Sequence, residues 1–471
     1  MIKLFRSSSA KWLVFLADCL FIYVSYWLAY SIKFHNRVPA EEWNSYLHYA
    51  PWLGVLMGGT FYFFNLYDMS GRQKLGKYRF NLVLAHLVIA VELIMLSYWF
   101  KGFILPRSIL IIGFVLGLWF TVGLRHLFYY MQSKAIGKKR ALIVIKDPKR
   151  DLAIVEKVQR QGNTWFEIQK VCILPDDNQR VAGAMLDEID VLILNHDIPS
   201  QVRIELIRQA GVKQLEVVMI PDFYELYLTG AEPQQIDDLL VYSIMPPRLS
   251  LFERFAKRAI DLAIATVLLL IASPVMVLMF IVIPTTSRGK ALFVQERVGL
   301  HEKQFNLMKF RSMVDNAEKG TGPVLARDRD PRITRLGQFI RATRIDELPQ
   351  LINVMRGEMS LVGPRPEREF FITQFKEELP HYGYRLMVKP GLTGLAQVRA
   401  NYTTMPSDKL RYDLLYIKNY SPMLDLKILF QTIMVVLQRE QSKGVLADQA
   451  ADATIEHLIV DAQMEMASSK D

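Results

Sequence analysis

The stretch "TRIDELPQLINVMRGEMSLVGPRP", Thr343 to Pro366, combines two adjacent acids, an apolar stripe at helical spacing and an arginine between two prolines. A proline is tolerated only in the first turn of a helix, so Pro349 predicts that a helix begins close to Asp346. We expect this helix to end at Arg356, because the following Gly357 is a natural C-terminal stop. Its predicted buried face consists of Leu348, Leu351, Ile352 and Met355.

The two acids, Asp346 and Glu347, fall at a helix N-terminus, where the helix dipole and free backbone N–H groups favour an ionised carboxylate. An ionised carboxylate suits a nucleophile or a metal ligand, although an aspartate at a helix start is most often simply a cap. Basic residues nearby in the sequence favour a site for phosphate oxygens and a divalent cation. These residues are Lys309, Arg311, Arg341, Arg344 and Arg365. The prolines beside Arg365 fix the backbone around it, which a merely solvated charge would not need.

The residues before this stretch predict two strands and a helix. Two apolar runs flank a Gly-Leu-His turn in "FVQERVGLHEKQFNLMKFRSM", which predicts a pair of strands. The segment "DPRITRLGQFIRAT" predicts a helix whose buried face contains Ile333, Leu336, Phe339 and Ile340.

Composition places the chain among membrane proteins with soluble parts. It has 471 residues, 51% of them hydrophobic, and a mean hydropathy of +0.15, which is too long for one ordinary domain and too apolar for a wholly soluble protein. In a membrane protein, a formal charge of +10 favours anionic lipid or phosphorylated substrates over nucleic acid. Cys19 and Cys172 lack metal-type spacing, so we expect neither a disulfide framework nor a metal cluster.

Four apolar segments open the chain, each near the ~20 residues that span hydrocarbon. They are Trp12–Ile32, Pro51–Tyr67, Leu82–Phe100 and Ile109–Met131, and their lysine- and arginine-rich flanks place both ends of the bundle in the cytoplasm. Asp18, His86 and Glu92 lie at membrane depth. A transport or lipid site would explain them, but inter-helix hydrogen bonds are the favoured interpretation.

A fifth apolar segment, Leu262 to Ile283, would be about 33 Å long as a helix, just enough to cross a bilayer. Basic residues flank both of its ends, which argues against crossing. The central pair Ser273-Pro274 breaks the helix, because proline removes a backbone donor and serine can satisfy a freed carbonyl. We therefore predict a re-entrant helix over residues 255–284 that leaves on the face it entered. A kinked spanning helix is the alternative.

Between these membrane parts, short β-branched runs alternate with helical stretches. The runs "ALIVI", "DVLILN" and "LEVVMI" predict βαβ units around a parallel sheet. The turn after the first run, "IKDPKR", has no glycine that would let a pyrophosphate approach the backbone, so we expect a Rossmann-like domain without a dinucleotide. A regulatory or scaffolding role is then expected for it.

Together these patterns predict a membrane protein that combines α and α/β domains. Residues 1–135 form a four-helix transmembrane domain, residues 136–245 the Rossmann-like cytoplasmic domain, residues 249–440 a mainly helical catalytic domain, and residues 441–471 a disordered or loosely helical tail.

From about Leu251 to Glu440 the chain resembles the bacterial polyprenyl-phosphate sugar-1-phosphate transferases, the monotopic phosphoglycosyl transferases. The matching motifs occur in the family's order: "KRAIDLAIA", the Ser-Pro pair, "KFRSM", "DPRITRLG", "IDELPQLINVMRGEMSLVGPRP", "KPGLTGLAQV" and "DLLYIKNYSPMLDLKIL". The four preceding spans and the Rossmann-like domain resemble the long members, which initiate exopolysaccharide, capsule or O-antigen assembly. One departure follows "GLAQV", where the family often has a small residue, Gly and Arg, whereas this chain has "RANY".

The resemblance implies transfer of a sugar 1-phosphate from a UDP-sugar to undecaprenyl phosphate, with release of UMP, at the cytoplasmic face of the bacterial inner membrane. It implies that Asp346 is the nucleophile and a Mg²⁺ ligand, and that Glu347 is its partner. Lys309, Arg341 and Arg365 match phosphate-holding positions. We also assign substrate binding to five further residues within or beside these motifs: Arg311, Pro364, Pro366, Thr393 and Gln397.

Two alternatives stay open. A plain hexose, glucose or galactose, is expected from the length and the four added spans, but an N-acetylhexosamine is not excluded. A scaffold of polysaccharide assembly with a decayed site is the rival from another class, and intact acids and basic residues count against it. The expected partners are the UDP-sugar, undecaprenyl phosphate and membrane lipid, with a homodimer left open and no nucleic acid.

Overall fold

The computed structural model describes residues 8–67, 75–99, 106–136, 138–147, 151, 154–159, 166–174, 186–229, 231–244, 249–314, 330–400 and 404–438. The chain divides into two compact units, residues 1–220 and residues 221–447. The predicted C-terminal tail and the "NYT" that follows Arg399-Ala400 lie outside the described residues.

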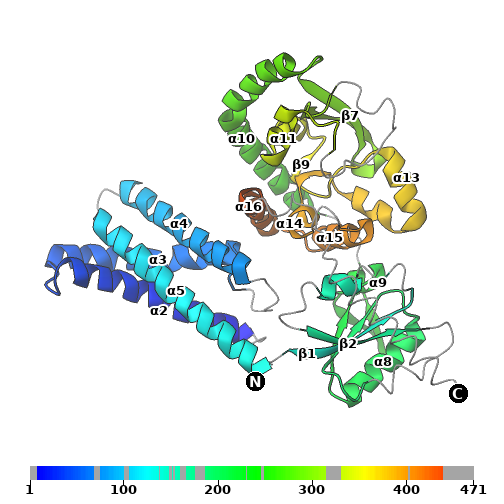
Figure 1. The fold of residues 1–471 in the computed structure, drawn as a ribbon, viewed down its shortest axis with the longest axis horizontal. Coiled ribbons are helices and arrows are strands. Elements are labelled where there is room, and N and C mark those ends of the chain that lie inside the picture. Colours follow the sequence, from blue (N-terminus) through cyan, green and yellow to red (C-terminus); the bar gives the residue numbers. More distant parts are fainter. Residues whose placement is uncertain are drawn as a thin grey trace. The chain divides into compact units, whose positions relative to one another are not determined.

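The first unit opens with a bundle of four helices (Figure 1): α2 (Ser8–Lys33), α3 (Ala40–Phe63), α4 (Leu75–Trp99) and α5 (Arg107–Ile136). In the part of the chain that the structure describes, four helices are long and apolar enough to cross a membrane: Lys11–Lys33, Tyr78–Trp99, Arg107–Met131 and Leu251–Thr286. The first three agree with predicted spans. The second predicted span lies in α3, which is not among the four and begins with polar residues well before Pro51.

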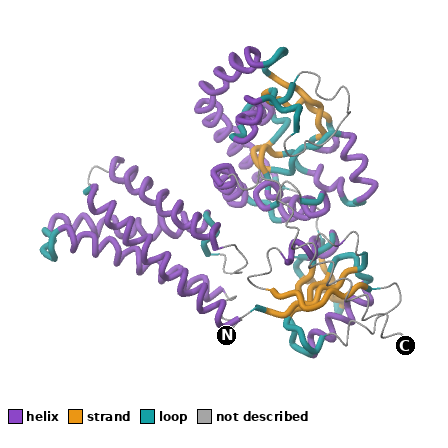
Figure 2. The backbone as a smooth tube through the Cα atoms, in the orientation of Figure 1, coloured by secondary structure: helices purple, strands orange, loops and turns teal. Residues whose placement is uncertain are grey.

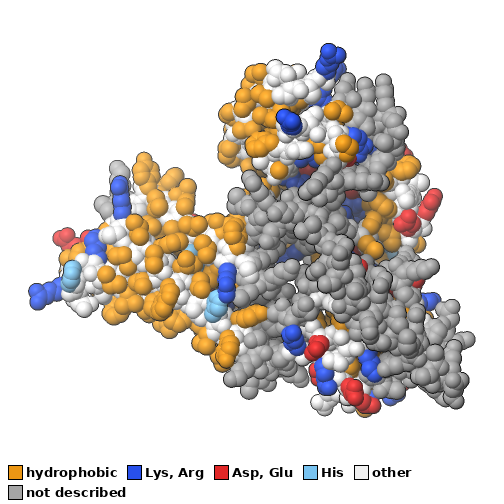
Figure 3. Space-filling model, in the orientation of Figure 1, with side chains coloured by type: hydrophobic (Ala, Val, Ile, Leu, Met, Phe, Trp, Pro, Cys, Tyr) orange, Lys and Arg blue, Asp and Glu red, His pale blue; other side chains and the backbone are white. Residues whose placement is uncertain are grey.

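The polar residues inside this bundle bond between helices. Asp18 on α2 pairs with Arg125 on α5, and His86 on α4 lies 3.2 Å from the hydroxyl of Thr121 on α5. Glu92 on α4 accepts a hydrogen bond of 3.1 Å from Thr60 on α3. Apolar side chains cover the visible outer face of the bundle instead (Figure 3). The large apolar residues exposed on its helices include Trp12, Leu16, Leu20, Val115 and Trp119. This arrangement is the one expected of a bundle surrounded by lipid.

The first unit also contains the predicted parallel sheet, with strands in the order β2 (Phe166–Ile173), β1 (Lys139–Ile145), β3 (Val191–Leu194) and β4 (Glu216–Met219), seen in orange in Figure 2. Alternate residues of β1 enter two separate apolar clusters, so the sheet is buried on both faces. Helix α8 (Ser200–Val212) connects β3 to β4. The prediction of a parallel sheet is confirmed, but the sequence analysis missed β2.

The turn after β1 is closed by a carboxylate. Asp151 is 3% exposed and accepts the backbone N–H groups of Lys146 and Asp147, each at 3.3 Å. These N–H groups follow the first strand, where a dinucleotide fold would present donors to a pyrophosphate. The absence of a dinucleotide from this domain stays a prediction, and a carboxylate at this turn supports it.

The second unit begins with α9 (Phe223–Leu228) and the hairpin β5 (Pro233–Ile236) and β6 (Leu239–Tyr242). The predicted boundary of the middle domain at residue 245 stays a prediction. Then come α10 (Leu251–Thr286), the antiparallel strands β7 (Leu292–Val298) and β8 (Gln304–Phe310), and α11 (Arg335–Ala342). The remaining elements are η2 (Ile345–Glu347), α12 (Gln350–Arg356), β9 (Ser360–Val362), α13 (Glu369–Glu378), η3 (Tyr382–Met387), β10 (Gly391–Thr393), α14 (Leu395–Arg399), α15 (Pro406–Lys418) and α16 (Pro422–Gln438).

Helix α10 is one helix of 36 residues that contains Pro274 and Pro284, and Figure 1 shows that it is bent. The hydroxyl of Ser273 donates to the carbonyl of Leu270 at 2.8 Å, so the serine bonds back to its own helix as expected beside a proline. Whether both ends of α10 lie on one side of a membrane stays a prediction.

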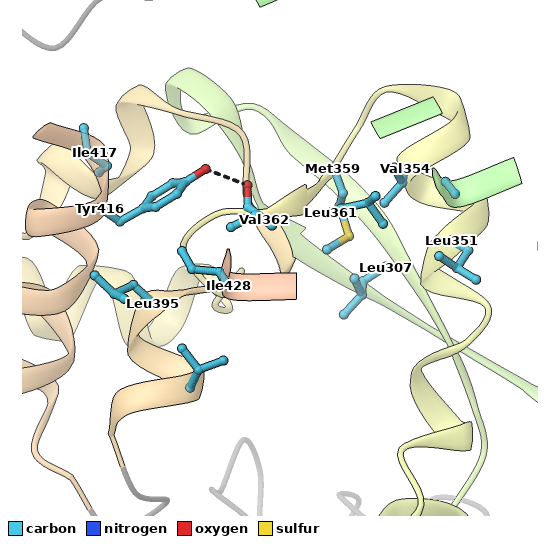
Figure 4. Packing of buried hydrophobic residues seen from close by; sticks show 12 residues of the cluster. Leu307, Leu351, Val354, Met359, Leu361, Val362, Leu395, Tyr416, Ile417 and Ile428 are labelled. Atoms are coloured by element: carbon cyan, nitrogen blue, oxygen red, sulfur yellow. Dashed lines mark hydrogen bonds between the residues drawn. The ribbon is translucent and has the colours of Figure 1, made fainter. Parts of the chain in front are cut away.

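The N-terminal turns of α10 hold the core of this unit. Lys257 donates to the carbonyl of Val362 at 3.1 Å and pairs with Asp425 at 2.7 Å, while the carboxylate of Asp261 accepts the backbone N–H of Leu361 at 3.1 Å. The hydroxyl of Tyr416 also donates to Val362 (Figure 4). These contacts fix β9, the strand that leads into Pro364-Arg365-Pro366, within a buried cluster that includes Leu351, Val354, Leu361, Leu395 and Ile428.

Two residues of the predicted buried faces are exposed. Phe339 is 56% exposed on α11, and Met355 is 37% exposed on α12. Helix α12 begins at Gln350, after a 3₁₀ turn at Ile345–Glu347, instead of running continuously from Asp346. The break shifts the phase of the helix, so Val354 is buried where we expected Met355.

Candidate active site

The two acids lie in the short 3₁₀ turn η2 that joins α11 to α12. Arg344 precedes them in a left-handed conformation, with φ of 59°, which turns the chain between the two helices. The N-cap of α12 is Pro349, so Asp346 does not cap that helix. Its side chain is only 9% exposed, and its Oδ1 has no hydrogen-bond partner among the described residues. A buried, unpartnered carboxylate oxygen is costly, which points to a ligand at this position.

Glu347, in contrast, is fully engaged. Its Oε1 accepts a hydrogen bond of 2.6 Å from Nη2 of Arg365 and one of 3.3 Å from Nη1 of Arg344. Arg365 reaches the acids from the segment after β9, and Lys309 comes from the end of β8. Asp346, Glu347, Arg365 and Lys309 come from three separate segments of the chain and lie at one place.

The charges around the site shift the pKa values of the two neighbouring acids in opposite directions. Burial and the adjacent Glu347 raise the pKa of Asp346 above its ordinary value, against the opposing effect of Lys309 and Arg341. For Glu347, burial also acts upward, but Arg365 and Lys309 outweigh it and hold the pKa below the ordinary value. The surroundings therefore favour the ionised form of Glu347 more strongly than that of Asp346, which has the more basic carboxylate.

The surroundings also shift the pKa of Lys309. Its burial, together with the nearby Arg365, lowers its pKa to about 8, although Glu347 favours the charged form. An ammonium group with a pKa in this range is still mostly charged at pH 7. It is suited to an incoming phosphate.

Gly363 and Gly391 allow β9 and β10 to approach closely just before Arg365. A Cβ atom on Gly391 would lie 2.1 Å from the backbone nitrogen of Gly363, and one on Gly363 would lie 2.4 Å from the carbonyl of Lys389. The N–H of Gly391 donates to the carbonyl of Pro364 at 2.9 Å. The glycines and prolines of "VGPRP" and "KPGLTG" therefore aim Arg365, which gives Pro364 and Pro366 a positioning role.

Three predicted substrate-binding residues are engaged elsewhere. Arg311 donates to the carbonyls of Ser287 and Arg288, at 2.7 and 2.8 Å, and so binds the C-terminal end of α10. The hydroxyl of Thr393 lies 2.7 Å from that of Thr432 on α16, and Gln397 donates to the carbonyl of Leu392 at 3.2 Å. Gln397 keeps one unpartnered buried oxygen, Oε1.

The donor set fits a divalent cation that is completed by substrate. In the described part of the chain no group of three His, Cys, Asp or Glu residues is arranged to hold a metal ion. Mg²⁺ is commonly bound by one or two carboxylates together with substrate phosphates, so a dedicated protein cage is not required. The unpartnered Oδ1 of Asp346 is an appropriate ligand.

Sequence reasoning missed three contributors to the site. Arg344 was noted only as a nearby charge, although its left-handed backbone shapes the turn. Asn353 is fully buried, accepts the N–H of Met308 at 3.1 Å and donates to the carbonyl of Asn306 at 2.8 Å, which fixes the strand that carries Lys309. Arg385 donates to the carbonyl of Arg365 at 2.8 Å. A buried asparagine inside an apolar helix was the one available signal.

Comparison with known proteins agrees with this geometry. Residues 252–439 match the family model described as "Bacterial sugar transferase". An Aeromonas hydrophila protein named UDP-N-acetylgalactosamine-undecaprenyl-phosphate N-acetylgalactosaminephosphotransferase is 45% identical over 39% of this chain and 44% of its own length. A Salmonella typhimurium undecaprenyl-phosphate galactose phosphotransferase is 37% identical over 48% of this chain and 50% of its own.

A longer match reaches beyond this region. A Xanthomonas campestris UDP-glucose:undecaprenyl-phosphate glucose-1-phosphate transferase is 30% identical over 67% of this chain and 66% of its own length. The chain spans about half the length of the first relatives named above. Residues 252–439, which contain α10, both acids and Arg365, are therefore a bacterial sugar transferase domain.

Proposed function

We propose that this chain transfers a hexose 1-phosphate from a UDP-hexose to undecaprenyl phosphate, releasing UMP, as the first membrane step of a surface polysaccharide. The observation that carries the proposal is the buried, unpartnered Oδ1 of Asp346 beside Glu347 and two cations. The names of the relatives support both substrates.

In the proposed first step, the carboxylate of Asp346 attacks the phosphorus that carries the sugar, and the bond from that phosphorus to the UMP oxygen breaks. The phosphosugar is then held on Asp346 as an acyl phosphate, and UMP leaves with the bonding electrons. In the second step, a phosphate oxygen of undecaprenyl phosphate attacks the same phosphorus and frees Asp346.

The other residues stabilise charge in these steps. Arg365 and Lys309 would hold the oxygens of the diphosphate, and Glu347 fixes Arg365 through its 2.6 Å hydrogen bond. Mg²⁺, when bound through Asp346 and the diphosphate, would supply positive charge at the leaving oxygen.

The experiment is an assay of the purified full-length chain in detergent or nanodiscs, with undecaprenyl phosphate, Mg²⁺ and a panel of UDP-sugars. UMP release that requires the lipid acceptor for multiple turnovers would support the transfer. Without acceptor, intact-mass measurement should show one added hexose phosphate, absent from Asp346→Asn. A folded chain that releases no UMP with any sugar would favour the non-catalytic scaffold.

A second candidate substrate is a UDP-N-acetylhexosamine. It is favoured by the 45% identity to the Aeromonas protein named for N-acetylgalactosamine. The same panel separates the two, because it compares UDP-glucose and UDP-galactose with their N-acetylated counterparts under identical conditions.

The proposed topology puts both ends of α10 on the cytoplasmic face of the inner membrane, where a soluble nucleotide sugar meets a lipid phosphate. Single cysteines in place of Leu251 and Lys290, both exposed near the helix ends, test it. An impermeant thiol reagent should label both in inverted vesicles and neither in intact cells. Labelling of the Lys290 position from outside would show that α10 spans the membrane.

A further inference from the structure

The role proposed for Arg365 requires its guanidinium to stay directed at Glu347. The flanking prolines alone do not fix the backbone of Arg365 well enough for this. Pro364 and Pro366 fix their own φ angles, and Pro366 also restricts Arg365 to extended conformations. Within the extended range, ψ of Arg365 can still vary by about 40°, and the direction of its carbonyl varies with it. A second contact is needed to fix it.

Arg385 supplies that contact. Its Nη2 donates to the carbonyl of Arg365 at 2.8 Å, and the same nitrogen pairs with Asp413 at 2.9 Å. Its Nη1 donates to the hydroxyl of Tyr382. Arg385 is only 7% exposed and Asp413 only 2%, so both charges lie in the interior of the unit.

Burying this ion pair costs desolvation free energy, so its presence in the interior calls for a structural or functional reason. The elements that carry Arg385 and Asp413, η3 and α15, also contribute Leu386, Leu410 and Leu414 to one buried apolar cluster. A buried ion pair generally contributes little to stability compared with well-packed apolar residues. Its value here is directional, because a planar guanidinium can bind a carboxylate, a hydroxyl and a carbonyl at fixed angles.

The elements that carry the pair are rigidly held. Tyr382 and Arg385 lie on η3 and Asp413 on α15; α9 packs on α15, and its Phe223 ring contacts that of Tyr384 on η3. The ring of Phe223 on α9 stacks on His381 with centroids 4.0 Å apart, and Lys418 on α15 donates to the carbonyl of Leu226 at 3.0 Å.

We propose that Arg385, held by Asp413 and Tyr382, is a positioning residue for catalysis: it fixes the backbone of Arg365 and thereby the contact between Arg365 and Glu347. This inference rests on the proposed function, because Arg365 is taken as a phosphate-binding residue. Arg385 touches neither acid in this account and acts only through Arg365.

The test is a double-mutant cycle between Arg385→Lys and Arg365→Ala, measured in UMP release and in thermal unfolding. Lysine keeps the charge beside Asp413 but cannot bind three partners in a plane. Arg385→Lys alone should lower kcat/KM by about tenfold, mainly through kcat, as expected for a misaimed group. In the Arg365→Ala background it should lower activity by less than about twofold, whereas its effect on the unfolding temperature should be unchanged.

The opposite pattern overturns the proposal. If Arg385→Lys lowers activity by the same factor in both backgrounds, or leaves it unchanged in a folded protein, Arg385 does not act through Arg365. If Arg385→Lys fails to fold, Tyr382→Phe replaces it, because it removes one partner of Arg385 and keeps the ring. Tyr382→Phe should lower activity by less than Arg385→Lys does, and it should have no effect in the Arg365→Ala background. Arg411→Lys is the matched control: Arg411 lies on α15, the helix that carries Asp413, and bonds to Asp408 and to the carbonyl of Pro221, so activity should be retained.

A readout without turnover separates this inference from the proposed function. Phenylglyoxal modification of Arg365, followed by mass spectrometry, should be severalfold faster in Arg385→Lys than in the unmodified chain, since the Arg365 side chain would leave Glu347 more often. An unchanged rate would contradict the positioning role even if UMP release is observed. A faster rate in a chain that releases no UMP would leave the positioning role intact and remove the proposed function.

Discussion

Two buried aspartates, one in each compact unit, show how differently the same side chain is used. Asp151, after the first strand of the parallel sheet, accepts two backbone N–H groups at the turn that it closes. Asp346 is buried almost as well, yet its Oδ1 has no partner among the described residues. Burial is common to both, so it does not identify the reactive acid. What distinguishes them is whether the hydrogen-bonding capacity of the carboxylate is already used within the fold.

The largest expected effect is at Asp346. Asp346→Asn should lower UMP release by on the order of a thousandfold or more, because an amide cannot attack phosphorus. Asp151→Asn is the counterpart: it should cost about 1 kcal/mol of stability, by weakening hydrogen bonds to the turn, and leave activity within about twofold. Substantial UMP release by folded Asp346→Asn would break the comparison.

Arg365 should show the next largest effect. Arg365→Ala removes the 2.6 Å partner of Glu347 and a phosphate contact, and one charge-assisted contact contributes about 2 kcal/mol, or about a 30-fold loss in kcat/KM. Arg344→Asn is the control, since Arg344 bonds the same carboxylate oxygen at 3.3 Å from a more exposed position and asparagine tolerates the left-handed backbone. Its loss should be about threefold. Equal losses would show that the more exposed arginine, Arg344, matters as much as Arg365.

Lys309 predicts a pH dependence. Because its folded-state pKa is lowered to about 8, the cationic form is present below that pH and is lost as pH rises through it. The kcat/KM for the UDP-sugar should therefore fall about fivefold between pH 8 and pH 9, while kcat holds to higher pH because bound phosphate restores the proton. Lys309→Arg should shift the alkaline limb upward. If the alkaline fall in kcat/KM occurs at the same pH in Lys309→Arg, a group other than Lys309 causes it.

Arg311 should show the smallest effect on activity. It was predicted to bind substrate, but its guanidinium is bonded to the C-terminal end of α10. Arg311→Lys should lower the unfolding temperature by a few degrees, for a loss of about 1 kcal/mol, and change kcat/KM by less than about threefold. A tenfold loss of activity at unchanged stability would return Arg311 to the substrate site.

Local chemistry made much of the site predictable. Pro349 and Gly357 bracket α12, and Gly357 has the left-handed conformation, with φ of 83°, that a helix stop requires. The strands on either side of the Gly-Leu-His turn and the parallel sheet follow from short apolar runs with period-two or continuous burial. The acids and Arg365 lie within one continuous stretch, so their proximity needed little long-range information.

Contacts between distant segments could not be predicted in this way. Arg385 and Asp413 are 28 positions apart and meet only because η3 and α15 pack together. The divergence of Arg311 from Lys309, two positions away on the same face of the chain, depends on where α10 ends. The phase of α12 depended on a 3₁₀ turn that amphipathic spacing cannot reveal.

The length of helix α10 has a consequence for the position of the active site relative to the membrane. Its first turns are bonded to β9 through Lys257 and Asp261, and the bent helix then continues to Thr286, with 36 residues in all. With its apolar part in the bilayer as proposed, the number of residues after Asp261 sets the height of Asp346 above the lipid. Four added residues would change that height by about 6 Å. The enzyme would then choose its lipid by the depth at which a phosphate lies, and the length of the polyprenyl tail would matter much less.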